Sequence, residues 1–140
     1  MPERTIKALG EIALRVDNLD VMQKFYTEVV GLELIKRFPQ SAFFKVAEGY
    51  AGHTNILALF DRTEREGYTG LDIARTTVDH FAFTIDLENF EAEKARLESL
   101  GCRVTTTTHP WVQWRSLYFR DPEGHNVEFV CYDASIPKEE

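Results

Sequence analysis

Hydrophobic and polar residues alternate in two stretches of the chain that have nearly the same pattern. Residues 11–17 and residues 80–86 each form a short alternating run that ends in aspartate. Each run is followed by apolar residues at helical spacing, and each helical segment closes at a glycine, Gly31 or Gly101. Because side chains of a strand point alternately to opposite faces, such runs predict half-buried strands. The pattern predicts a strand and a helix that occur twice.

The first predicted helix carries a single apolar stripe. Asp17 or Asn18 is suited to cap its start, and Gly31 suits a left-handed cap at its end. Its apolar residues recur at spacings of three and four, which places them on one side of a helix: Leu19, Met22, Phe25, Tyr26, Val29 and Val30.

The second predicted helix covers residues 88–100, with Phe90, Leu97 and Leu100 on its buried side. After each glycine come three strand-like segments: 32–37, 42–46 and 54–60, then 103–107, 115–120 and 126–132. Turns rich in glycine and proline separate them. The sequence thus predicts an α+β fold, a single domain of two βαβββ modules over about 8–60 and 78–133, with a linker over about 61–77 and a frayed tail over 133–140.

Composition and charge narrow the partners. A chain of 140 residues with 44% hydrophobic and 28% charged residues is typical of one globular domain. Its apolar runs are too short to span a bilayer, and its first residues lack the features of a signal peptide, so a cytoplasmic location is the default expectation. The net charge of −7 argues against nucleic acid and anionic membranes as partners. A small molecule is the expected partner.

The predicted strands can be sorted into two faces. One face is wholly apolar and suits contact with the helices: Ile12, Leu14, Val16, Leu57, Leu59, Phe81, Phe83, Ile85, Val127, Phe129 and Cys131. The other face mixes small and ionisable residues: Glu11, Ala13, Arg15, Ile56, Ala58, Phe60, His80, Ala82, Thr84, Glu128, Val130 and Tyr132. Small residues beside a few polar groups leave room for a ligand, so this second face is the predicted binding face.

Three stretches of the sequence resemble the vicinal oxygen chelate superfamily, which includes glyoxalase I, bleomycin-resistance proteins, fosfomycin-resistance thiol transferases and extradiol dioxygenases. The first stretch runs from residue 12 to residue 34, and residues 12–17 and 25–34 carry its resemblance. The second is residues 79–83, and the third is residues 118–129 with the turn Asp121-Pro122-Glu123-Gly124. The resemblance covers almost everything from Ala8 to Tyr132. It implies that the two modules form an incomplete barrel around a cleft.

The resemblance also implies positions for metal ligands. Metal-dependent members take ligands from the first and last strands of each module, which correspond here to Glu11, Ala58, His80 and Glu128. The family usually has histidine at the first of these positions and often Glu or Gln at the second, so this chain departs at Glu11 and at Ala58. The remaining set, Glu11, His80 and Glu128, suits a divalent ion such as Mn²⁺, Fe²⁺, Mg²⁺, Zn²⁺ or Ni²⁺. A hydrogen-bonded His80–Glu128 pair without metal is the alternative.

Further candidates lie on or near the binding face. Arg15 is placed to meet an anionic group of a substrate, or to pair with a nearby carboxylate. Ser116 and Tyr118 match positions that help bind the phosphonate in fosfomycin-resistance enzymes. Those enzymes need a histidine at the position of Glu11 and a threonine at that of Ala13, so that activity is not predicted. Trp111 and Trp114 are candidates for an aromatic lip over the cleft; the alternatives are a dimer contact or ordinary core packing. Phe60 completes the predicted substrate-binding residues.

Two turn histidines, His53 and His125, are predicted to be exposed to solvent. No nucleotide fingerprint and no triad for covalent catalysis is present in the sequence.

Two functions follow from these features. The first is a metal-dependent enzyme of the glyoxalase or dioxygenase type (a lyase, isomerase or dioxygenase), with Glu11 or Glu128 as general base. The second is a binding or drug-resistance protein of the bleomycin-resistance type that holds its ligand without metal. A homodimer is expected because relatives commonly pair and each module has an open sheet edge.

Overall fold

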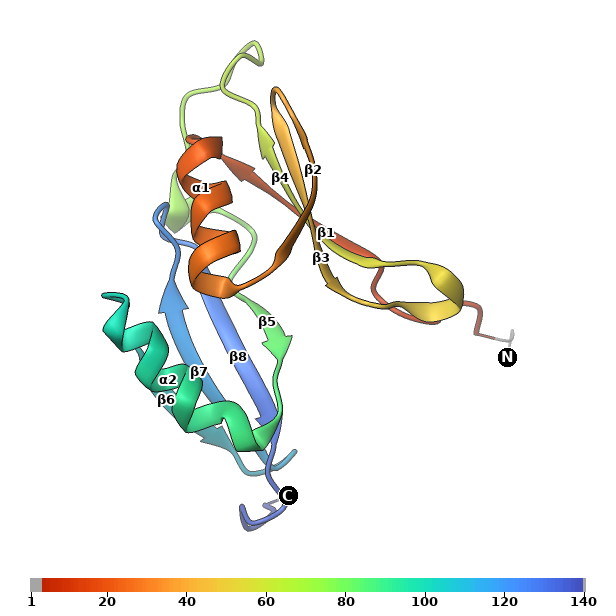
Figure 1. Ribbon diagram of the computed structural model, residues 1–140, viewed down its shortest axis with the longest axis vertical. Coiled ribbons are helices and arrows are strands. Elements are labelled where there is room, and N and C mark those ends of the chain that lie inside the picture. The colour runs from red at the N-terminus through yellow and green to blue at the C-terminus, as the bar shows by residue number, and fades with distance from the viewer. Residues whose placement is uncertain (1–3, 140) are drawn as a thin grey trace. The chain divides into compact units, whose positions relative to one another are not determined.

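The structure, a computed structural model, describes residues 4–139 of the chain. The chain divides into two compact units, the first ending at Leu71 and the second beginning at Asp72. Each unit holds a four-stranded mixed sheet with a helix against one of its faces (Figure 1). No helix in residues 4–139 has the length and apolar character needed to cross a membrane.

Unit one contains β1 (Glu11–Val16), α1 (Leu19–Phe25), a π-helical turn (Tyr26–Val30), β2 (Glu33–Phe38), β3 (Ser41–Ala47), a short 3₁₀ turn (Tyr50–Gly52) and β4 (Asn55–Asp61). The strand order is β1-β4-β3-β2. Strands β1 and β4 run parallel, whereas β3 is antiparallel to both of its neighbours.

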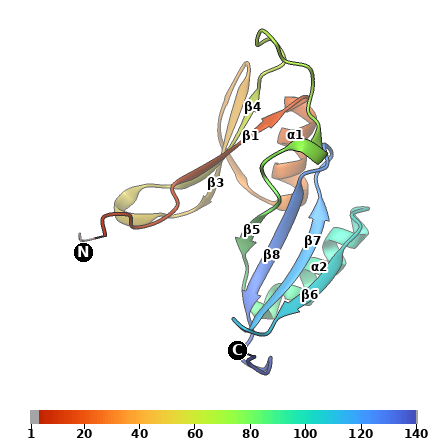
Figure 2. The same cartoon turned by 180° about the vertical axis from the view of Figure 1, so that it is seen from behind.

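Unit two repeats this plan. It contains two 3₁₀ turns (Ile73–Arg75 and Leu87–Asn89), β5 (Phe81–Thr84), α2 (Phe90–Ser99), β6 (Thr105–His109), β7 (Trp114–Arg120) and β8 (Asn126–Tyr132). The strand order β5-β8-β7-β6 matches that of unit one position by position, with β5 parallel to β8. The view from behind shows strands β5, β8 and β7 in front of α2 (Figure 2). The predicted α+β fold and its internal repeat are confirmed.

Helix α1 packs through the stripe that the sequence predicts. Asn18 caps it, because its side-chain oxygen accepts a hydrogen bond from the Val21 amide at 3.1 Å. Met22 and Tyr26 are fully buried, and the Tyr26 ring lies 6.1 Å from that of Phe44 on β3. The final turn is a π-helix rather than the predicted continuation of the α-helix, and Gly31 closes it with φ of 92°.

Three predictions at the ends of elements are wrong. Leu100 is 52% exposed rather than buried, because α2 ends at Ser99 and Leu100 is its C-cap residue. Strand β6 starts two residues later than expected and extends to His109. Strand β5 is shorter than expected and ends at Thr84, although the Ile85 amide still donates to the Val130 carbonyl at 2.9 Å.

The C-terminal segment is not the frayed tail that was predicted. Asp133 and Ile136 are buried, and the Asp133 amide donates to the Gln113 carbonyl at 2.8 Å. The Gln113 side chain in turn donates to the Ile136 carbonyl at 2.9 Å. These hydrogen bonds fix the segment against the turn before β7.

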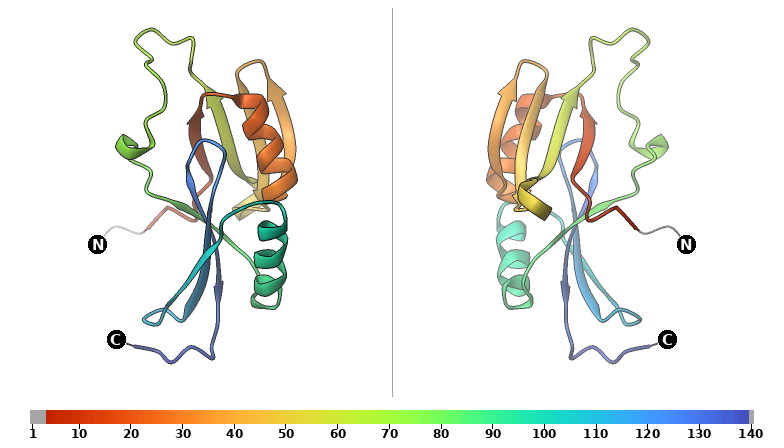
Figure 3. Two further views of the ribbon diagram at one scale, coloured as in Figure 1. Left: turned by 90° about the vertical axis from the view of Figure 1, so that its left-hand side faces the viewer. Right: turned by 90° about the vertical axis from the view of Figure 1, so that its right-hand side faces the viewer.

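The segment predicted as a linker joins β4 to β5 mainly as an irregular loop (Figure 3). Its middle is anchored within unit one, since the Leu71 amide donates to the Asp17 carboxylate at 3.2 Å and the Tyr68 hydroxyl donates to the same side chain.

Candidate functional site

In unit two, two of the predicted metal ligands lie side by side. His80 immediately precedes β5, and Glu128 lies on the neighbouring strand β8, opposite Ala82. His80 Nε2 is 3.4 Å from Glu128 Oε1. The Glu128 side chain is only 6% exposed, whereas that of His80 is 42% exposed. The carboxylate is thus shielded from solvent, whereas the imidazole beside it is accessible.

The other nitrogen of His80 is held by a residue that the sequence reasoning missed. His80 Nδ1 lies 2.6 Å from a carboxylate oxygen of Asp79. A carboxylate can only accept here, so Nδ1 donates to Asp79, and the imidazole lies between two carboxylates, Asp79 at Nδ1 and Glu128 at Nε2. The signal in the sequence was the adjacent carboxylate, since ligating histidines commonly donate their second N–H to such a group.

The second oxygen of Glu128 is bound by Ser116. Ser116 Oγ, on β7, donates to Glu128 Oε2 at 2.6 Å, and Ser116 is fully buried. The buried carboxylate is therefore contacted on one oxygen by a hydroxyl and on the other by an imidazole. This satisfies the requirement that a buried charge be paired or hydrogen-bonded.

Tyr118 lies beside the same carboxylate. It pairs directly with Glu128 across β7 and β8, and its ring is 6.1 Å from that of His80. Burial, and next the negative charge of Glu128, raise the pKa of the Tyr118 phenol above its usual 10.0, so the hydroxyl stays protonated at neutral pH. His109, which the sequence reasoning did not single out, has its Nε2 3.2 Å from this hydroxyl.

Trp114 begins β7 on the same face as Ser116 and Tyr118, opposite Tyr132. It is 43% exposed, and Trp111 in the preceding turn is 65% exposed. Both indoles are therefore accessible in unit two.

The remaining predicted site residues belong to unit one. Glu11 and Arg15 are exposed on β1, and Arg15 pairs in register with Phe60 on β4. Ala58 pairs with Ala13 on one side and with Phe43 on the other, and it is fully buried. Within either unit, counting residues 4–139, no three His, Cys, Asp or Glu side chains are arranged to hold a metal ion.

His125 was predicted to be exposed, and this is wrong. Its side chain is 4% exposed, and its Nδ1 lies 2.8 Å from Asp121 Oδ2. The other Asp121 oxygen accepts hydrogen bonds from the amides of Glu123 and His125, both at 3.0 Å. The carboxylate thus organises the turn between β7 and β8. His53, by contrast, is exposed as predicted.

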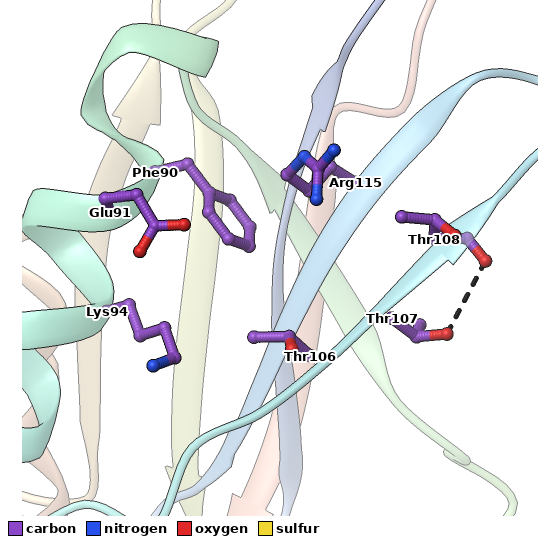
Figure 4. A pocket seen from close by; sticks show the side chains of 7 residues that line it. All are labelled: Phe90, Glu91, Lys94, Thr106, Thr107, Thr108 and Arg115. Atoms are coloured by element: carbon purple, nitrogen blue, oxygen red, sulfur yellow. Dashed lines mark hydrogen bonds between the residues drawn. The ribbon is translucent and has the colours of Figure 1, made fainter. Parts of the chain in front are cut away.

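Unit two also has a hollow on the helix side of its sheet (Figure 4). Its volume is about 470 Å³, and it is lined by Phe90, Glu91, Lys94, Thr106, Thr107, Thr108 and Arg115. Its two cations are already paired, Arg115 with Asp133 at 3.0 Å and Lys94 with Glu98 at 3.4 Å. The hollow is therefore a weaker candidate for ligand chemistry than the Glu128 face.

Comparison with known proteins identifies the family. Residues 8–129 match the profile of the Glyoxalase/Bleomycin resistance protein/Dioxygenase superfamily. The chain belongs to this superfamily. The resemblance read from the sequence motifs is thereby confirmed.

Individual superfamily members are moderately similar to the chain. Glutathione transferase FosA of Serratia marcescens is 28% identical over 123 residues, which is 88% of this chain and 79% of FosA. Metallothiol transferase FosB of Lysinibacillus sphaericus is 27% identical over 130 residues, which is 89% of this chain and 82% of FosB. The crystal structure of lactoylglutathione lyase from Agrobacterium tumefaciens has 32% identity and a TM-score of 0.69, and the match covers 91% of this chain and 96% of that one.

Proposed function

We propose that this member of the glyoxalase superfamily is a divalent-metal-dependent enzyme that acts on a small, oxygen-rich substrate. Its metal ligands are Glu11, His80 and Glu128. The relatives support a metal and a small-molecule substrate, because they include a metallothiol transferase and a lactoylglutathione lyase.

One observation carries the proposal. His80 Nε2 faces Glu128 Oε1 at 3.4 Å, while Asp79 binds Nδ1. When Nδ1 donates to Asp79 and Nε2 carries no proton, the Nε2 lone pair and the Glu128 carboxylate can both bind one cation. One nitrogen and one carboxylate oxygen with a carboxylate behind the histidine form a donor set that fits a divalent ion.

Glu11 is the proposed third ligand. Among residues 4–139 its side chain has no hydrogen bond or ion pair, so the carboxylate is available. Three protein ligands leave coordination positions open for substrate oxygens. When bound, the metal would act as a Lewis acid that stabilises negative charge developing on a substrate oxygen.

The other side chains have distinct proposed roles. Glu11 or Glu128 is the general base, and Glu11 is the less constrained of the two because Ser116 and His80 contact both oxygens of Glu128. Tyr118 keeps its proton and can donate a hydrogen bond to a substrate oxygen. Arg15 supplies a planar cation for an anionic group, and Trp114 and Phe60 supply apolar surface.

Metal content tests this function directly. Untagged wild-type protein purified without chelators is measured by elemental mass spectrometry beside His80→Ala, Glu128→Gln and Glu11→Gln. We expect close to one ion per chain in the wild type and its loss in His80→Ala and Glu128→Gln. The exposed His53 provides a matched control, and His53→Ala should retain the metal. A wild type that stays metal-free after incubation with Mn²⁺, Fe²⁺, Mg²⁺, Zn²⁺ and Ni²⁺ would overturn the proposal.

A second function is favoured by the two departures from the family's ligand pattern. Ala58 offers no ligand atom, and Glu11 stands where the family usually has histidine; His80 and Glu128 can then pair with each other without a metal. In that case the protein binds or sequesters a small molecule without metal, as bleomycin-resistance-like members do. Ligand binding that persists unchanged in excess chelator would support this function over the first.

We also propose a homodimer. Each sheet has two edge strands, β1 and β2 in unit one and β5 and β6 in unit two, and these carry backbone groups that can pair with another strand. Light scattering coupled to size-exclusion chromatography gives the molar mass, and a value near that of one 16.2 kDa chain would contradict the dimer.

A further inference from the structure

The sheet of unit one presents two ordered rows of side chains on the face turned away from α1. In register across the strands, the first row is Arg15, Phe60, Ser41 and Phe38. The second row is Ala13, Ala58, Phe43 and Lys36. Partners in register lie side by side on the same face of a sheet. We call these eight residues, together with Arg62, the aromatic face.

Three phenylalanine rings form the centre of the aromatic face. The Phe43 ring lies 5.7 Å from that of Phe60 and 6.0 Å from that of Phe38, both edge to face. Phe38 is 47% exposed, and Phe43 and Phe60 are partly exposed. Edge-to-face pairs hold rings in defined orientations and leave ring surface for a further aromatic group.

Cations flank the rings on several sides. The guanidinium carbon of Arg62 lies 4.5 Å from the centre of the Phe60 ring, and Lys36 Nζ lies 5.4 Å from that of Phe38. Arg15 adjoins Phe60 in the first row. None of these three cations forms an ion pair with any residue in 4–139. In a chain of net charge −7, three unpaired cations around one apolar surface favour an anionic ligand.

Two small side chains, Ala13 and Ala58, lie beside the rings on the aromatic face. Ala13 and Ala58 are adjacent, and both stand beside larger side chains. Ala58 is fully buried although neighbouring residues of β1 are exposed, so the side chains around it shield it from solvent. At the position where metal-dependent relatives often have a ligand, this chain therefore has a small, covered apolar residue, and Ala13 beside it is exposed.

We propose that the aromatic face binds an aromatic ring that carries an anionic substituent, and that the substrate is such an aromatic anion. The ring packs on Phe43 and Phe60 beside the exposed Ala13, and the anionic group meets Arg62 and Arg15. A ligand that both packs on the phenylalanine rings and accepts hydrogen bonds from a guanidinium must carry an aromatic ring and an anionic group. This inference rests on the proposed function, since it names the class of substrate.

The first test uses three probes on metal-free, chelator-treated wild-type protein with ¹³C-labelled alanine methyl groups. The probes are 2-naphthoate, acetate, which has the anion alone, and 2-naphthylmethanol, which has the ring alone. We expect 2-naphthoate to bind most tightly and to shift the methyl signals of Ala13 and Ala58 by its ring current. The methyl signals of Ala92 and Ala95 on α2 should not move. Equal affinities for acetate and 2-naphthoate would overturn the inference. Methyl signals of Ala13 and Ala58 that do not shift with 2-naphthoate would overturn it as well.

Matched variants assign the contacts. Phe43→Leu and Phe60→Leu each remove a ring, and we expect 2-naphthoate to bind about threefold to tenfold more weakly. Tyr50→Leu removes an exposed ring of unit one outside the aromatic face and should leave binding unchanged. Arg62→Gln should reduce the preference for 2-naphthoate over 2-naphthylmethanol, whereas Arg65→Gln should not. Unchanged affinity in both phenylalanine variants would also overturn the inference.

The outcome is separable from that of the metal proposal. The probe titrations contain no metal, so they succeed or fail without reference to His80 and Glu128. If metal is bound but 2-naphthoate is not, the enzyme proposal stands and the substrate class is wrong. If 2-naphthoate binds to a protein that takes up no metal, the aromatic face serves the metal-free binding function instead.

Discussion

Ser116 donates a 2.6 Å hydrogen bond to one oxygen of Glu128, from the strand that pairs with β8. Both side chains are buried, so water cannot replace the hydroxyl if it is removed. Hydrogen bonds to charged groups contribute about 1.5–3 kcal/mol, and a buried carboxylate that loses a donor is penalised further. This bond therefore links the stability of unit two to the carboxylate that we assign to the metal.

We first predict that Ser116→Ala lowers the free energy of unfolding by about 1.5–3 kcal/mol, measured by urea denaturation. The matched control is Ser99→Ala, because Ser99 donates to a carbonyl at an exposed position on α2. That variant should change stability by less than about 0.5 kcal/mol. Equal effects of the two substitutions would show that the Ser116 bond is not important for stability.

Asp79→Asn tests the orientation of His80. The amide can still contact Nδ1 but removes the negative charge behind the imidazole. Loss of such an outer carboxylate typically weakens metal affinity about tenfold to a hundredfold, and we expect a loss in that range by competition with a fluorescent chelator. Asp86→Asn, an exposed position in the same segment, is the control. Wild-type affinity in Asp79→Asn would mean that the Asp79 contact does not prepare a ligand.

The buried pair of Asp121 and His125 predicts a graded loss of stability. Asp121→Ala removes the acceptor for two amides and for the histidine ring, so we expect at least about 3 kcal/mol of destabilisation. His125→Ala removes one of these contacts and should cost less. His53→Ala, at an exposed turn, should be close to neutral in the same denaturation experiment. The reverse order of the two large effects would contradict the assignment of Asp121 as the organiser of the turn.

Asp133 predicts a loss of stability in acid. Hydrogen bonds from Ser135, and then the contact with Arg115, hold the pKa of the Asp133 carboxyl below its usual 3.8. A lowered folded-state pKa contributes stability that is fully present above the unfolded value and is lost as the pH falls below 3.8 through the folded value. Asp133→Asn should flatten the fall in urea midpoint between neutral pH and about pH 3. Glu139→Gln, in the same segment but exposed, should leave that dependence unchanged.

The docked C-terminal segment gives a fifth prediction. Ile136 is 6% exposed, and its truncation to alanine should cost about 2–5 kcal/mol. It should also speed hydrogen exchange at the Asp133 amide, which bonds to Gln113. Lys138→Ala, at an exposed neighbouring position, should do neither. A neutral Ile136→Ala variant would mean that the segment is held by its backbone hydrogen bonds alone.

Most of the fold could be predicted because the signals were local. Alternation of apolar residues placed the strands to within about two residues, and Asn18 and Gly31 marked the ends of the first helix. Such signals depend on one segment and its immediate neighbours. The π-helical turn at Tyr26–Val30 could not be predicted, because it has the same apolar spacing as an α-helix.

The parts that could not be predicted depend on which strands pair and in what register. His80 and Glu128 were singled out together because family motifs mark them. His109 contacts Tyr118 through side chains on one face of the sheet, although the register places Trp114 opposite His109, so sequence spacing does not reveal the contact. Phe43 belongs to the aromatic face only because it lies opposite Ala58. Its place in a turn predicts an exposed His125, but the Asp121 carboxylate four residues earlier binds its ring and amide and holds it in a buried position.

The order of strands within each sheet has a consequence for synthesis on the ribosome. Strand β1 lies at a sheet edge, and its neighbour in that sheet is β4, the last strand of the unit to be made. Residues 11–16 therefore stay unpaired until residues 55–61 have left the exit tunnel, and the same delay recurs for β5 and β8. A nascent chain that stalls between these points exposes an apolar strand, which is the moment at which a chaperone would be needed most.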